Sequence, residues 1–181
     1  MGRMIEKIVY WLSRLNNERP MRLSTKGEYA SRAMLELSLR QAAAPLHIRE
    51  ISAAQDIPEK FLEQILLQLK RAGYLRSRKG PHGGYSLARP ADRISVAEVI
   101  RVMDGPLAPI DCVSVTAHEF CPREAFCGLR GLWKETRDAI AAILERTTFA
   151  DLAHRTAKAK AVFSDRRPSP SRPRSKKKAR S

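Results

Sequence analysis

The chain has 181 residues, with 34 Lys or Arg against 19 Asp or Glu, so its formal net charge is +15. That length suits one globular domain with appendages, and no apolar run approaches the roughly 20 residues that a membrane-spanning helix needs. The positive charge favours a polyanionic partner, with nucleic acid ahead of a membrane surface. Three cysteines and no secretory signal argue against a disulfide-bonded secreted protein, so we expect a cytoplasmic one.

Both ends of the chain have the composition of appendages. Residues 1–20 form an N-terminal extension, and Met21 begins a new segment where we expect native translation to start. Residues 164–181 hold eight basic residues, one acid, three prolines and five serines. This composition predicts a disordered basic tail, which can attract phosphates but cannot recognise a sequence.

Residues 21–90 have the pattern of a helix-turn-helix followed by a wing. Thr25 and Glu28 have the spacing of a capping box, which predicts a helix start. Residues 48–55 predict a short helix, and Pro58 is suited to open a second one. That second helix has an apolar stripe and Gly73 as its stop; the stripe consists of Phe61, Leu62, Ile65, Leu66 and Leu69. Two helices joined by a tight turn predict a helix-turn-helix.

A short ribbon follows these helices. Residues 75–78 and 85–87 alternate like strands, and the glycine-rich segment 80–84 between them predicts a turn. Arg78, Lys79 and His82 make the tip of this wing basic, so it can approach a phosphate or a narrow groove. A helix-turn-helix with a basic wing predicts binding to double-stranded DNA.

The second helix carries side chains that can read bases. Lys60 and Gln64 lie four residues apart on the face opposite the apolar stripe, with Glu63 beside them. Lysine can reach guanine, an amide can pair with adenine, and glutamate can accept from cytosine. These residues stand near the start of the helix, where recognition helices present side chains to base edges.

The C-terminal half is expected to contain a connecting helix within 91–106, a loop over 107–128 and a long helix over 129–152. Ser95 and Glu98 form a second capping box. The loop lacks a helical period and contains all three cysteines. The long helix has more apolar positions than a small winged domain can cover, so we predict a homodimer that reads paired half-sites.

Five segments carry a family resemblance: Met21–Gly27, Phe61–Gln64, Gly80–Tyr85, Asp104–Leu107 and Leu132-Trp133. They resemble the BadM/Rrf-two family of bacterial transcription regulators, including its IscR-like and NsrR-like members, from Met21 to about Leu152. The resemblance implies a mainly α-helical winged helix-turn-helix with a small β-wing and a long dimerisation helix. It also implies an iron–sulfur cluster on Cys112, Cys121 and Cys127. The DNA-contacting positions that it implies are Lys60, Glu63, Gln64, Ser77, Lys79 and Gly80.

The cysteine loop departs from the IscR-like pattern. Eight residues separate Cys112 from Cys121, where IscR has five, and Arg130 stands where IscR has a histidine ligand. Thiolates suit iron–sulfur centres, of the [2Fe–2S] or [4Fe–4S] type. Zinc favours closer cysteine spacing, a thiol–disulfide switch is favoured by the basic neighbours, and purely structural cysteines are a further alternative.

Two residues are candidates for a fourth cluster ligand. Some family members use an acidic side chain from the opposite subunit at the position of Glu28, where the common family pattern has arginine. His118 lies within the cysteine loop and is the second candidate. Glu28 also has a purely local explanation in the capping box with Thr25.

The sequence therefore predicts a cluster-sensing transcriptional repressor that responds to redox state, nitric oxide or iron. The alternative is a cluster-free winged-helix regulator switched by thiol oxidation or a small ligand. An enzyme is not expected, because no nucleophile–base pair, phosphate loop or paired carboxylates stand at a useful spacing.

Overall fold

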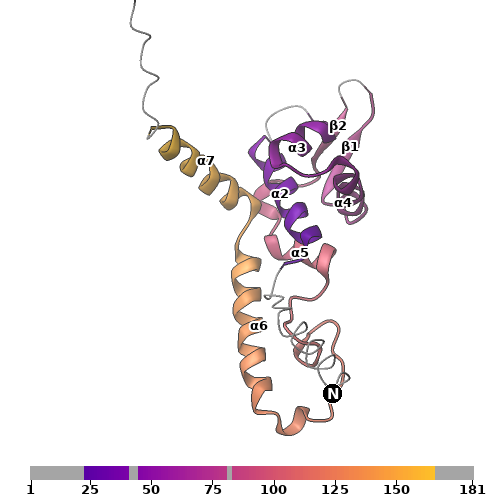
Figure 1. Cartoon of the computed structure of the whole chain (residues 1–181), viewed down its shortest axis with the longest axis vertical. Helices are drawn as coiled ribbons and strands as arrows, with labels where there is room; N and C mark the ends of the chain where they lie inside the picture. Colours follow the sequence, from indigo (N-terminus) through magenta and orange to yellow (C-terminus); the bar gives the residue numbers. More distant parts are fainter. Residues whose placement is uncertain (1–22, 41–44, 81–82, 166–181) are drawn as a thin grey trace, which may run out of the picture.

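A helical body with a two-stranded sheet lies at one end of the molecule, and a long helix extends away from it (Figure 1). The computed structural model describes residues 23–40, 45–80 and 83–165. Helices α2 (Thr25–Leu39), α3 (Ile48–Gln55) and α4 (Glu59–Arg71) share one core. Strands β1 (Leu75–Arg78) and β2 (Gly84–Leu87) pair antiparallel, with Leu75 opposite Leu87. The body is thus a winged helix-turn-helix, and the predicted fold class is confirmed.

Helix α4 is amphipathic, and its apolar stripe lies in the core. Leu62, Ile65, Leu66 and Leu69 are at most 1% exposed, which fits positions three and four residues apart on one face. Phe61 was predicted to belong to this stripe, but 41% of its surface is exposed. It lies at the edge of the stripe and packs edge-on against Tyr29, with the ring centroids 5.6 Å apart.

Helix α2 begins one residue earlier than its predicted capping box implies. The N-cap is Ser24, whose hydroxyl accepts a hydrogen bond from the Gly27 amide at 3.0 Å. Glu28 is therefore free of the capping role expected with Thr25, and it forms an ion pair with Arg32 at 3.7 Å. Ser24 also donates through its backbone amide (3.2 Å) and its hydroxyl to Asp104.

The wing is attached to the body through the segment before α3. The Leu46 and Tyr85 backbones exchange two hydrogen bonds, at 2.8 and 2.9 Å. Gly84 makes this approach possible, because its φ is +146° and a Cβ atom there would collide with the Leu46 carbonyl oxygen. The base of the wing is therefore fixed against the segment before α3.

Three further α-helices follow in the described chain: α5 (Val96–Asp104), α6 (Gly128–Arg146) and α7 (Phe149–Asp165). The structure confirms the Ser95–Glu98 capping box. The predicted helix over 129–152 is instead two helices, because Thr147 and Thr148 are extended and pair with Ser95 and Val96.

Helix α7 returns to pack against α2, with Phe149 fully buried. It continues to Asp165, so the predicted tail begins inside a helix. The N-terminal extension, Met21 and residues 166–181 lie outside the described residues. None of the described helices combines the length and the apolar character that crossing a bilayer requires.

Candidate nucleic-acid interface and cysteine loop

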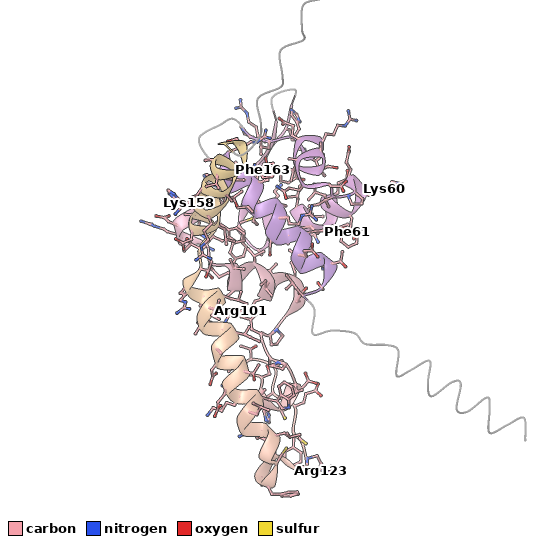
Figure 2. All side chains as sticks on the ribbon, turned by 60° about the vertical axis from the view of Figure 1, so that its left-hand side comes forward. Lys60, Phe61, Arg101, Arg123, Lys158 and Phe163 are labelled. Carbon is pink, nitrogen blue, oxygen red and sulfur yellow. The ribbon has the colours of Figure 1, made fainter. Side chains whose placement is uncertain are left out.

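The face of α4 that points away from the core carries the predicted base-reading residues. Lys60, Glu63 and Gln64 are all exposed, and Figure 2 shows Lys60 at the outer side of the body. The buried side of α4 holds them in place, because the four core residues fix the rotation of the helix. This face presents ammonium, carboxylate and amide groups together, which are the groups that contact base edges.

Strand β1 and the wing tip add positive charge beside α4. Ser77, Arg78, Lys79 and Gly80 are exposed, and the tip is closed by a hydrogen bond from the Gly83 amide to the Gly80 carbonyl at 2.8 Å. His82, also predicted to contact DNA, lies outside the described residues. Arg76 is exposed on the same strand. Sequence reasoning passed over it, although the alternation of the strand could have indicated it.

The basic residues of this surface are available to an external anion. Within the described residues, no carboxylate lies at ion-pair distance from Lys60, Arg78 or Lys79. Arg49 at the start of α3 differs, since its guanidinium lies 3.8 Å from the Glu59 carboxylate. Unpaired cations on one surface are suited to contact phosphates without first breaking an internal ion pair.

The cysteine loop lies far from this surface, alongside the distal part of α6 (Figure 1). Cys112 sits in a short 3-10 turn (Asp111–Val113), and Cys127 is the N-cap of α6. All three cysteines are free thiols of intermediate exposure. Over the described ranges, however, no three Cys, His, Asp or Glu side chains are close enough together to hold a metal ion.

A charged network holds the loop against α6. The Glu124 carboxylate contacts His118 Nε2 at 3.1 Å and Arg130 at 2.5 Å. Desolvation opposes it, but the hydrogen bond from His118 and the charge of Arg130 together lower the pKa of Glu124. Arg137 on α6 also donates to the Val113 carbonyl. Sequence reasoning singled out His118 as a possible ligand but missed its partner Glu124.

Of the two candidates for the fourth ligand, His118 lines a small pocket together with Cys112, whereas Glu28 lies on another element. Glu28 is on the first turn of α2, with 57% of its side chain exposed, and it pairs with Arg32. His118 is engaged with Glu124. The donor chemistry of three free thiols suits an iron–sulfur cluster, whereas their positions in this structure do not form one coordination shell.

Comparison with known proteins finds both sequence and structural relatives. The family model of Rrf2, an iron-dependent transcriptional regulator, matches residues 23–155. An HTH-type transcriptional regulator of Mycobacterium tuberculosis is 40% identical over 134 residues, covering 74% of this chain and 81% of that protein.

Two solved structures resemble this chain, and the match covers most of each of those proteins. CymR, the global cysteine regulator of B. subtilis, has a TM-score of 0.64 and 32% identity, covering 75% of this chain and 98% of that one. IscR of T. potens has a TM-score of 0.61 and 27% identity, covering 83% and 94%.

Proposed function

The chain belongs to the Rrf2 family of transcriptional regulators, and on that premise we propose that it is a homodimeric, cytoplasmic repressor. It binds operator DNA and responds to redox state, nitric oxide or iron through an iron–sulfur cluster in the cysteine loop. The observation that carries the DNA-binding part is the exposed polar face of α4 beside Arg78 and Lys79 of the wing, which pair with no carboxylate among the described residues.

The dimer is supported by an exposed stripe along α6. Leu129, Leu132 and Ile143 are 61%, 54% and 52% exposed, and they share a face with Thr136 and Ala139. Their spacing of three and four residues is that of a two-stranded helical interface. No residue of α6 is buried within the protomer. A second copy packed along this stripe would cover it and would place two recognition helices on paired half-sites.

The iron–sulfur part of the proposal rests on the donor set and on the family description. Cys112, Cys121 and Cys127 would hold the cluster, with Glu28 of the partner subunit or His118 as a fourth ligand. The cluster would supply a site that reacts with oxidants or nitric oxide. The loop must rearrange for its thiolates to converge, because they do not form one donor group among the described residues. A loop that changes shape next to α6 can alter the relative position of the two DNA-binding bodies.

A second candidate function is a cluster-free regulator switched by thiol oxidation or a small ligand. The separation of the donors in this structure favours it, as does the likeness to a protein described as a cysteine regulator. The surface that contacts DNA is the same in both cases, so the two functions differ only in the chemistry of the loop.

Anaerobic purification of the full chain separates the two candidates. A cluster predicts visible absorbance, with iron and acid-labile sulfide bound to the protein, and the loss of all three in a Cys112→Ala, Cys121→Ala, Cys127→Ala variant. Operator binding is measured on a duplex selected from random sequences, before and after exposure to air. A colourless, iron-free protein whose DNA binding ignores the triple substitution would remove the sensing role and leave the DNA-binding one.

Single substitutions then test the fourth ligand. Glu28→Gln and His118→Gln keep the size of each side chain, and only the true ligand should shift the absorbance spectrum of the anaerobic protein. Arg32→Gln is a matched control for Glu28, because it removes the ion pair without removing a ligand.

A further inference from the structure

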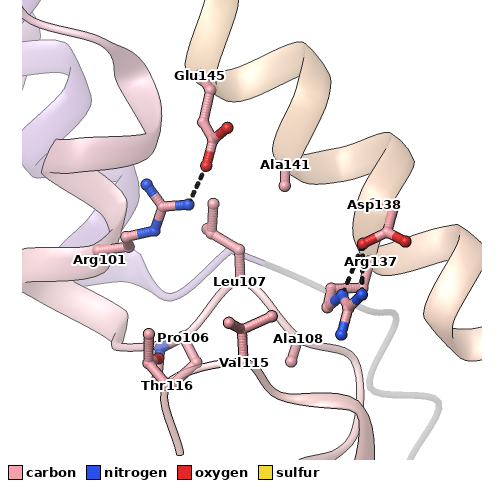
Figure 3. Close-up of a pocket in the computed structure, with 10 residues that line it drawn as sticks. All are labelled: Arg101, Pro106, Leu107, Ala108, Val115, Thr116, Arg137, Asp138, Ala141 and Glu145. Atoms are coloured by element: carbon pink, nitrogen blue, oxygen red, sulfur yellow. Dashed lines mark hydrogen bonds and ion pairs between the residues drawn. The ribbon is translucent and has the colours of Figure 1, made fainter.

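A cavity of about 320 Å³ opens between α5, α6 and the first part of the cysteine loop (Figure 3). Its volume is near the lower end for ligand sites, so it suits a small molecule. The proposed DNA contacts and cluster ligands do not use it, since none of those residues lines it.

Charged pairs flank an apolar centre in this cavity. Arg101 on α5 pairs with Glu145 on α6 at one side, and Arg137 pairs with Asp138 at 2.5 Å at the other. Figure 3 shows Leu107 between the two pairs, with Val115 and Ala141 also in the lining. The lining therefore offers two guanidinium groups and two carboxylates with no net charge, and an apolar wall between them.

This chemistry selects the class of ligand. An anion that binds one of these guanidinium groups also lies near the carboxylate paired with it, and a cation at a carboxylate lies near the arginine, so a like charge opposes each. A zwitterion can give its carboxylate to a guanidinium and its ammonium group to Glu145 or Asp138, so that every charge stays paired. An apolar side chain of modest size can then contact Leu107, Val115 and Ala141.

The cavity also remains open in the proposed dimer. On an α-helix, Ala141 and Glu145 lie roughly half a turn around the axis from Ala139 and Ile143, which belong to the exposed stripe. A partner packed on the stripe would leave the cavity accessible. A ligand there would contact both the last turns of α5, which belongs to the DNA-binding body, and the middle of α6.

We propose that this cavity binds a free α-amino acid with an apolar side chain, and that the bound ligand fixes α5 against α6. The proposal does not require iron, because neither a cysteine nor Glu28 nor His118 lines the cavity, although Val115 and Thr116 of the cysteine loop do.

The test is isothermal titration calorimetry of the full chain with L-leucine, L-isoleucine, L-valine and L-methionine. We expect at least one of them to bind once per protomer. N-acetyl-L-leucine and L-leucinamide, which each lack one charge, serve as controls for L-leucine and should bind at least about tenfold more weakly than it does. No binding by any of the four amino acids at 5 mM, roughly the weak limit of such sites, would overturn the proposal.

Two variants on α6 locate the site. Ala141→Phe fills the cavity and should abolish binding, whereas Ala142→Phe makes the same change at an exposed neighbour outside the lining and should not. A second variant, Asp138→Asn with Glu145→Gln, removes both carboxylate partners of the ammonium group without adding bulk, and should also weaken binding. Unchanged affinity in Ala141→Phe, or in the second variant where Ala141→Phe is unfolded, would place the ligand elsewhere. The triple cysteine variant should bind the amino acid normally, which separates this result from the outcome for iron.

Discussion

Gln64 and Lys79 belong to one exposed surface but are expected to contact DNA in different ways. Gln64→Ala should cost about 1–3 kcal/mol of operator binding and relax specificity at one base pair, because an amide can pair bidentately with adenine. Lys79→Ala should weaken binding to all sequences alike. It should also reduce the slope of log K against log salt concentration by about one, as expected for the loss of one phosphate contact. Fluorescence anisotropy against operator variants at several salt concentrations measures both. If Gln64→Ala kept the original sequence preference, α4 would not read that base pair.

The ionised Glu124 carboxylate takes part in the charged network that holds the cysteine loop against α6. Its pKa lies below the usual 4.5 because His118 and Arg130 stabilise the carboxylate against its desolvation. A depressed folded-state pKa contributes stability that is present above the unfolded value and is lost as pH falls through the folded one. The loop should therefore loosen only in acid, below pH 4.5.

An NMR titration of the Glu124 side-chain carboxyl carbon checks this expectation. Arg130→Gln should raise the Glu124 pKa toward its usual value, because it removes the charge 2.5 Å away. Arg123→Gln is the matched control: it removes the neighbouring arginine, which lies at the far tip of the loop (Figure 2) and has no ion pair with Glu124 among the described residues. If both variants shifted the Glu124 pKa equally, the effect of Arg130 would not come from its ion pair with Glu124.

Single residues also set the limit of what periodicity can predict. The pattern along α4 placed Leu62 and Ile65 correctly, but Phe61 lies at the edge of the stripe, and its exposure depends on where Tyr29 stands in space. Ser24 and Thr25 are both good N-caps, so local sequence does not decide between them. The N-cap is Ser24, which also contacts Asp104, 80 residues away in the sequence.

At the scale of elements, Asp104 joins the end of α5 to the start of α2. Its carboxylate accepts from the Ser24 amide and hydroxyl, and a Cβ atom on Gly27 would lie 2.5 Å from Asp104 Oδ2. Pro106 and the cysteine loop follow α5 directly. The contact between Asp104 and Ser24 therefore lies where the chain passes from the DNA-binding body into the loop.

Asp104→Ala should destabilise the fold by about 0.5–2 kcal/mol, the range for the loss of a capping interaction. Chemical denaturation of the wild type, Asp104→Ala, Ser24→Ala and the double variant forms a cycle. The two single effects should not add, because each substitution removes the same contact. Strict additivity would show that the two residues do not interact in solution.

Elements with a strong local signal were predicted within a residue or two. Helix α3 has the predicted bounds, and strand β1 begins and ends where the alternation does. The break between α6 and α7 was missed, although Thr148 and Asp151 have capping-box spacing, and their hydrogen bonds at 2.9 and 3.1 Å fulfil it. The apolar periodicity that continues across the break concealed it.

At the scale of the whole molecule, the sequence left open how the cysteine loop is arranged. Residues 107–127 have no period, so nothing local specifies which side chains meet. The pairing of Glu124 with His118 and Arg130, and the cavity beside Arg101, arise from how α5 and α6 are placed. Cysteine count and spacing could nominate the three thiols as ligands but could not position them.

The exposed stripe of α6 predicts the oligomeric state of the whole molecule, because a second copy of the chain would cover it. Ile143→Lys should shift the chain from dimer to monomer in sedimentation-equilibrium experiments. By symmetry the substitution occurs twice in a dimer. Because only 52% of Ile143 is exposed in the protomer, losing its burial at both copies costs about 1.5–3 kcal/mol, equivalent to a dissociation constant raised at least about tenfold.

Val162 on α7 provides the matched control for this substitution. It is 49% exposed against 52% for Ile143, but it lies outside the α6 stripe. Val162→Lys adds the same charge at a similarly exposed apolar position and should leave the dimer intact. The Ile143→Lys monomer should still fold, since no residue of α6 is buried in the protomer, while losing affinity for paired half-sites much more than for a single one. A dimer that survives Ile143→Lys but dissociates in Val162→Lys would move the interface from α6 to α7.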